Sequence, residues 1–210
     1  MRDKILAKIR QALKQPAEKS TRKPDFSASV YHPGEENDLA VLFAQNLVKA
    51  GAKFSFCIDE KEFIRELSPL LEKYFAGEVC VEDIHLQEVL KVADLPFSSG
   101  RRALMDAKVG ITTCEALVAR TGSVLVSSRQ AGGRALSVFP EVHIVVAFTS
   151  QLVYDLEDAF ALMRNRYNQQ LPSMLSLITG PSRTADIEKT LVLGAHGPMA
   201  LYVFLIESPV

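Results

Sequence analysis

Two glycine-rich segments of the sequence carry residue types that bind anions. The first is Gly180-Pro181-Ser182-Arg183-Thr184, where a predicted strand runs into a predicted helix at residues 184–190. Backbone N–H groups at a helix N-terminus, with two hydroxyls and a guanidinium beside them, form a site for a phosphate or a carboxylate. Capping of the helix by Ser182 or Thr184, with Arg183 paired to a nearby carboxylate, explains the same residues equally well.

The second glycine-rich segment, residues 127–136, also follows a predicted strand. The adjacent Gly132 and Gly133 let the backbone approach a ligand closely. Arg129 and Arg134 could hold a carboxylate or a phosphate. A turn with two exposed arginines is the plainer interpretation of this segment taken alone.

Two residues are candidates for acid–base work. Glu115 follows a predicted strand, where a carboxylate can act as nucleophile or general base, although the sequence shows no partner for it. His196 lies among small residues that would leave its ring accessible. A histidine ring that only bonds nearby backbone groups is at least as good an interpretation. Thr121 and Gly122 form a further turn next to a strand, directly before the predicted strand 123–127.

The cysteines and histidines do not form a metal-binding pattern. Cys57, Cys80 and Cys114 are widely spaced and include no Cys-x-x-Cys pair, so we expect reduced thiols and no iron–sulfur cluster held by this chain alone. The four histidines include no i, i+4 pair. We therefore expect no built-in metal and no cofactor.

The composition is that of an ordinary soluble globular protein, with 210 residues, 48% hydrophobic and 23% charged, and a formal charge of −1. The balanced charge lacks the basic excess of a nucleic-acid-binding domain. No window approaches the roughly 18 consecutive apolar residues that span a bilayer, and no apolar signal region follows the first residues. We expect a cytoplasmic protein with no transmembrane segment and no nucleic-acid partner.

Hydrophobic periodicity predicts helices that alternate with strands. Because the strands are almost continuously apolar, the pattern indicates an α/β fold, with a mostly parallel sheet flanked by helices on both faces. The expected helices are 2–14, 35–50, 59–74, 84–92, 152–166 and 184–190. The expected strands are 53–58, 78–82, 109–112, 123–127, 143–148, 176–179 and 201–206.

The sequence predicts a division near residue 34. Residues 1–34 comprise a basic amphipathic helix and a connector containing Pro16, Pro24 and Pro33, and residues 35–210 form the α/β domain. Residues 1–23 hold eight basic and two acidic residues, a charge of +6 that leaves −7 on the remainder. The helix could dock an acidic partner or a membrane surface, or pack its own apolar stripe and remain solvated, which is the commoner case.

The C-terminal run from Gly180 to Pro198, GPSRTADIEKTLVLGAHGP, closely resembles the signature of the LUD domain family, and within it the lactate utilization protein C group. Upstream motifs VGIT, TGS, GRALS and PEVHI, at residues 109, 121, 133 and 140, follow the family's order, and the helix from Arg2 to Arg10 resembles the family's N-terminus. The resemblance therefore covers nearly the whole chain. One departure is Arg120, where many members have an acidic residue; a function of that carboxylate would here be lost or taken by Glu115.

The resemblance implies a fold related to the NagB/RpiA/CoA transferase-like group. It also implies a role in oxidising L-lactate to pyruvate, in which this chain is a non-redox subunit that acts with two iron–sulfur partner proteins. We expect it to bind a small anionic ligand, a carboxylate or phosphate compound. The alternative is a stand-alone enzyme of the isomerase, CoA transferase or folate cyclo-ligase type on the same fold.

The candidate catalytic residues are Glu115 and His196. Motif position and the anion argument give the expected ligand-binding residues, which are Thr121, Gly122, Gly132, Gly133, Arg134, Gly180, Ser182, Arg183 and Thr184.

Overall fold

The computed structural model describes residues 2–13, 38–74, 76–185, 191–193 and 197–208. The chain divides into two units, residues 1–35 and 36–210. In the first unit, helix α1 (Arg2–Leu13) carries exposed Ile5 and Leu6 side chains. In the part of the chain that the structure describes, no helix is both long enough and apolar enough to cross a membrane.

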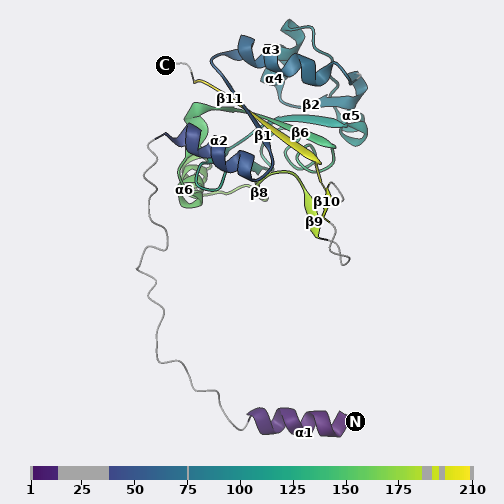
Figure 1. Ribbon diagram of the computed structural model, residues 1–210, viewed down its shortest axis with the longest axis vertical. Helices are drawn as coiled ribbons and strands as arrows, with labels where there is room; N and C mark the ends of the chain where they lie inside the picture. Colours follow the sequence, from purple (N-terminus) through teal and green to yellow (C-terminus); the bar gives the residue numbers. More distant parts are fainter. Residues whose placement is uncertain (1, 14–37, 75, 186–190, 194–196, 209–210) are drawn as a thin grey trace. The chain divides into compact units, whose positions relative to one another are not determined.

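A five-stranded parallel sheet forms the centre of the second unit (Figure 1). Its strand order is β1-β11-β6-β3-β2, and every neighbouring pair is parallel. The strands are β1 (Lys53–Cys57), β11 (Ala200–Ile206), β6 (Val142–Phe148), β3 (Val109–Thr113) and β2 (Val79–Val81). The predicted mostly parallel sheet flanked by helices is confirmed.

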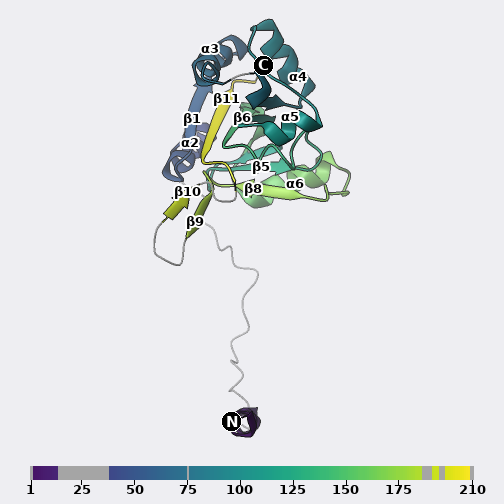
Figure 2. The ribbon, with the colours of Figure 1, turned by 90° about the vertical axis from the view of Figure 1, so that its right-hand side faces the viewer.

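Helices α3 (Glu60–Leu71) and α4 (Ile84–Val92) cover one face of this sheet (Figure 2). Both begin just after a strand because an aspartate caps them: Asp59 accepts the backbone N–H of Glu62, and Asp83 accepts that of Leu86. Their apolar sides share one buried cluster with the sheet, including Phe63, Leu67, Leu86, Leu90, Ile111, Ile144 and Phe204.

Helix α2 (Leu39–Lys49) and a second sheet cover the opposite face. The second sheet has the order β7-β4-β5-β8, from β7 (Leu152–Val153), β4 (Ala116–Val118), β5 (Ser123–Ser127) and β8 (Leu175–Ile178). Helix α6 (Leu156–Arg166) packs on its far side through Ala159 and Met163. The sequence did not predict β4, which is only three residues long, or a second sheet on this face.

Two predicted helices differ from the structure. Leu152 and Val153 pair with β4, so the helix expected from residue 152 begins only at Leu156, after its cap Asp155. The helix expected at 184–190 is wrong where the structure describes it, because β9 (Arg183–Ala185) pairs antiparallel with β10 (Leu191–Leu193). The β-branched Thr184 and the apolar residues of β10 favour strands. Residues 186–190 lie outside the described residues.

The remaining described elements are short. Helix α5 (Arg101–Asp106) lies next to β2, and the 3₁₀ turns η1 (Ala76–Glu78) and η2 (Thr149–Gln151) precede β2 and follow β6. Ala103 of α5 packs with Cys80 and Leu136 in a small buried cluster.

Candidate functional site

The chain leaves β2 and β3 toward opposite faces of the parallel sheet. After β2 it enters α4, and after β3 it enters β4 of the second sheet. Open α/β sheets bind ligands in the crevice that such a divergence leaves at the carboxyl ends of the strands. Glu82 after β2, and Thr113 and Glu115 at the end of β3, are the residues at this point.

Glu115 is the buried centre of a hydrogen-bonded cluster, with 2% of its surface exposed. Its Oε1 accepts the hydroxyl of Ser127 at 2.5 Å and that of Tyr167 at 2.7 Å. Its Oε2 pairs with Nη1 of Arg166 at 2.6 Å. Burial, and then the hydrogen bond to Glu115, raise the pKa of Tyr167, so the phenol keeps its proton and donates it. These are the partners that the sequence did not reveal.

The second glycine-rich segment lies beside this cluster. The side chain of Gln130 accepts the backbone N–H of Ser127 and donates to Thr113 Oγ1 at 3.2 Å, which ties the segment to the end of β3. Gly132 has a φ of +70°, and a Cβ there would meet the side chain of Leu136 at 2.7 Å and that of Glu82 at 3.2 Å. The segment therefore spans from the end of β3 to the residue that follows β2, and only glycine fits at its closest approach.

Three arginines lie on the segments around Glu115: Arg129 and Arg134 on the glycine-rich segment, and Arg166 at the end of α6. Arg166 is held by Glu115, with 42% of its side chain exposed. The backbone N–H of Arg129 donates to Ser127 Oγ, and Arg134 Nη2 donates to Ser173 Oγ. Both Arg129 and Arg134 are exposed, and neither pairs with a carboxylate among the described residues. Exposed guanidinium groups at such a point can take a carboxylate or a phosphate with two hydrogen bonds.

The other predicted ligand-binding residues lie at the opposite end of β5. Strands β5 and β8 are antiparallel, with Val124 opposite Ile178 and Ser127 opposite Leu175. Ser123 Oγ bonds both Thr121 Oγ1 and Thr179 Oγ1 at this end. Thr121, Gly122 and Gly180 are thus separated from the Glu115 cluster by the length of β5, about 13 Å for its five residues.

The contacts of this second group are with the C-terminal half of α2. A Cβ on Gly122 would meet the backbone of Asn46 and Leu47, and a Cβ on Gly180 would meet the carbonyl of Ala50. Arg183 Nη2 donates to that same carbonyl at 2.9 Å, which satisfies a helix-end acceptor. These contacts are structural; a ligand role for this group stays a prediction.

Four further residues named from the sequence remain, of which the structure describes three. Ser182 donates its backbone N–H to Pro198 O, and Thr184 lies on β9 rather than at a helix start. His196 lies outside the described residues. Arg120 pairs with Asp155 at 2.8 Å, at the end of β4 away from Glu115, so Glu115 does not stand in for a carboxylate at that position.

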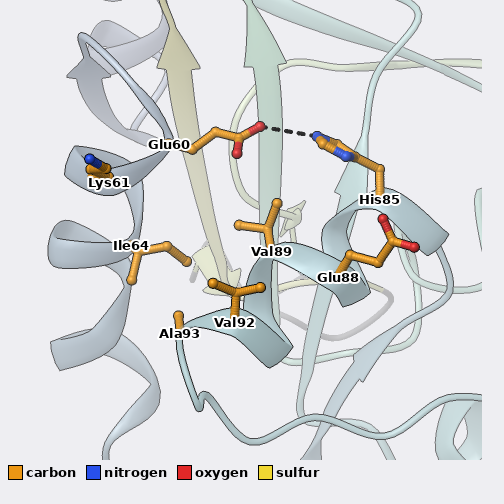
Figure 3. Close-up of a pocket in the computed structure, with 8 residues that line it drawn as sticks. All are labelled: Glu60, Lys61, Ile64, His85, Glu88, Val89, Val92 and Ala93. Atoms are coloured by element: carbon orange, nitrogen blue, oxygen red, sulfur yellow. Dashed lines mark hydrogen bonds and ion pairs between the residues drawn. The ribbon is translucent and has the colours of Figure 1, made fainter.

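The sequence did not predict two hollows on the α3–α4 side. One, about 1070 Å³, lies at the carboxyl ends of β1, β11 and β6. The other, about 510 Å³, is a groove between α3 and α4 (Figure 3). Glu60, Lys61 and His85 line both, and His85 Nε2 lies 3.1 Å from Glu60 Oε1. Glu60 and His85 are 25 residues apart in sequence. The sequence feature that could have indicated their contact is that each lies in the first turn of a helix that follows a strand.

A family model of the LUD domain matches residues 41–206. The chain belongs to the LUD domain family. Among curated relatives of this LUD domain protein, Lactate utilization protein C of Bacillus licheniformis is 33% identical over 104 residues, which is 49% of this chain and 43% of the relative. That of Macrococcus caseolyticus is 31% identical over 154 residues, 68% of this chain and 67% of the relative. The chain spans about half the length of most of these curated relatives that it matches.

A solved structure supports the LUD domain fold. A DUF162 family protein from Deinococcus radiodurans superposes with a TM-score of 0.60 at 21% identity, covering 80% of this chain and 96% of that one. This likeness concerns the fold alone. The relation to the NagB/RpiA/CoA transferase-like group stays a prediction from the resemblance.

Proposed function

We propose that this LUD domain protein takes part in lactate utilization, as the non-redox component of a system that oxidises L-lactate to pyruvate. The curated relatives named Lactate utilization protein C support the process. In this proposal, companion iron–sulfur proteins carry the electrons.

The placement of the thiols supports this division of labour. Cys57, Cys80 and Cys114 are all buried, each in a different apolar cluster. Burial raises the pKa of all three, that of Cys80 to about 12. A metal ligand must be a thiolate, and these three thiols are held apart in environments that oppose that form.

We place the small anionic ligand at the crevice beside Glu115. The observation that carries this proposal is a pair of exposed arginines, Arg129 and Arg134, on the glycine-rich segment that Gln130 ties to the end of β3. A ligand carboxylate or phosphate would accept their hydrogen bonds, while Glu115 and Tyr167 hold Arg166 and the floor of the site in place.

Ligand-dependent melting tests the site. A saturating carboxylate or phosphate, with L-lactate, pyruvate and inorganic phosphate as probes, should raise the melting temperature by about 4 °C at ten times its Kd. Arg134→Ala should remove most of this shift, whereas Arg183→Ala, at the other end of β5, should leave it unchanged. The reverse pattern would move the site to the α2 end, and no shift with any probe would refute it.

Reconstitution tests the process. Cells that use L-lactate and lack this chain should lose lactate-dependent growth, and the wild-type chain should restore it. If Arg134→Ala accumulates normally yet fails to restore growth, the crevice is required for the function. Growth that does not depend on the chain would refute the proposed role.

A stand-alone enzyme is the second candidate. The observation that favours it is the buried Glu115 carboxylate bonded to both a phenol and a serine hydroxyl, an arrangement that can move a proton. The purified chain should then turn over a coenzyme A thioester or a sugar phosphate without partners, and Glu115→Gln should abolish that turnover. Absence of turnover with both substrate classes would contradict the stand-alone enzyme.

A further inference from the structure

The groove between α3 and α4 has an apolar wall on each side. Figure 3 shows Ile64 on α3 facing Val89 and Val92 on α4, with Ala93 just after the end of α4. Val92 is 91% exposed. Exposed aliphatic side chains gathered in a concave site are typical of ligand grooves, and about 510 Å³ is within the range that small molecules occupy.

The groove opens into the cleft at the carboxyl ends of β1, β11 and β6, and its character changes there from apolar to acidic. Three acidic residues, Asp59, Glu60 and Glu207, line that cleft, together with one lysine, Lys61. Ser150 and Ser208 add two hydroxyls. The excess of acceptors favours a cation or a hydrogen-bond donor and opposes an anion.

His85 and Glu60 lie where the two hollows meet. Their contact joins the first turn of α4 to the first turn of α3, and both side chains are about half exposed, so they can also meet a ligand. The pair lines both hollows, and Figure 3 shows the contact at the upper end of the groove.

We propose that the two hollows together form a second binding site, for a small amphipathic amine. Its aliphatic or aromatic part lies between Ile64, Val89 and Val92, and its ammonium group lies by the carboxylates of Glu60 and Glu207. This site is chemically opposite to the anion site proposed beside Glu115, and the proposal does not depend on the role in lactate utilization.

The experiment titrates the full chain with n-octylamine below its micellar concentration and measures binding by calorimetry. Octanoate has the same tail with an anionic head, and propylamine has the same head without the tail. We expect saturable binding of one n-octylamine, with both comparison compounds at least about tenfold weaker, since each lacks one of the two complementary parts.

Two variants locate the site. Glu60→Gln should weaken n-octylamine binding about threefold to fivefold, the range for a partly exposed ion pair. Val92→Ser should weaken it about threefold by removing apolar contact. Glu157→Gln on α6 and Met105→Ser on α5 are the matched controls, because both residues are exposed and lie on other elements, and both should bind as the wild type does.

Each other outcome overturns the proposal. Equal binding of octanoate would show that the acidic cleft does not select the head group. Binding that neither Glu60→Gln nor Val92→Ser weakens would lie elsewhere. A dimer in analytical ultracentrifugation that Val92→Ser converts to a monomer would assign the groove to a second copy of the chain.

Discussion

Glu115 joins three elements through one carboxylate. Its partners are Ser127 at the end of β5 and, at the end of α6, Arg166 and Tyr167. Two of these are neutral hydroxyls that donate, and the third is a cation, so the buried charge is matched on both oxygens. The sequence predicted the importance of the strand end but not these partners, which lie 12 to 52 residues away.

Removal of the Glu115 carboxylate should lower the free energy of unfolding more than removal of any one of its partners. We expect Glu115→Ala to lower the free energy of unfolding by about 3 kcal/mol, because the hydroxyls of Ser127 and Tyr167 lose their acceptor. Tyr167→Phe should cost about 1 kcal/mol, the value of one hydrogen bond. Urea unfolding at pH 7 measures both, with the exposed Glu157→Ala as control. Equal losses for Glu115→Ala and Glu157→Ala would contradict the cluster's role.

His143 makes stability depend on pH. It is fully buried on β6, bonds Thr112 Oγ1 through Nε2 at 2.9 Å, and burial lowers its pKa to about 4. Its unfolded pKa is 6.5, so between pH 6.5 and 4 the unfolded chain binds a proton that the folded chain does not. Stability should therefore fall as pH drops through this range, by about 3 kcal/mol in total.

Urea unfolding at pH 7.5, 6 and 5 measures this dependence. In His143→Gln the contribution of this group to the slope should vanish. A His143→Gln variant with an unchanged slope would show that another group causes the loss.

Apolar periodicity predicted the positions of those helices and strands that are buried on one or both faces. Strand β6 and helix α4 agree with their predicted ranges because their apolar residues meet a core. The error at residues 183–185 has a different origin: a strand-loop-helix reading requires that the chain turn back onto the sheet, whereas here it pairs with β10. This partner is the next strand along the chain, and the β-branched Thr184 with the apolar residues of β10 was the local signal for it.

Gly122 determines how closely the turn before β5 approaches α2. Its φ is +61°, and a Cβ would meet the backbone of Asn46 and Leu47, which cannot move without breaking the helix. We expect Gly122→Ala to cost about 3 kcal/mol, from left-handed strain together with displaced packing. Gly77→Ala is the control, because nothing lies within 4 Å of its Cβ position. Thermal unfolding of the two variants should differ clearly, and similar melting temperatures would contradict this account.

At the scale of the whole molecule, the predicted ligand residues separate into two groups because β5 and β8 are antiparallel. The sequence places Thr121, Arg134 and Arg183 near strand ends, but it does not say which ends meet. The pairing of Val124 with Ile178 places Gly122 and Arg183 near the same end of the β5–β8 pair. The glycine-rich segment with Gly132 and Arg134 follows the other end, where Glu115 lies. The α3–α4 hollows could not be located from the sequence, because they arise from the packing of two helices that follow strands at opposite edges of the sheet.

The division of charge between the two units leads to a prediction for the N-terminal arm, residues 1–35. If the basic α1 docks a partner, deletion of residues 1–35 should abolish co-purification with the proposed iron–sulfur proteins, and so should charge reversal of Lys4, Lys8 and Arg10. Lys61→Glu on α3 is the control for a charge change outside the arm. A lower melting temperature without loss of partner would instead make the arm part of the fold.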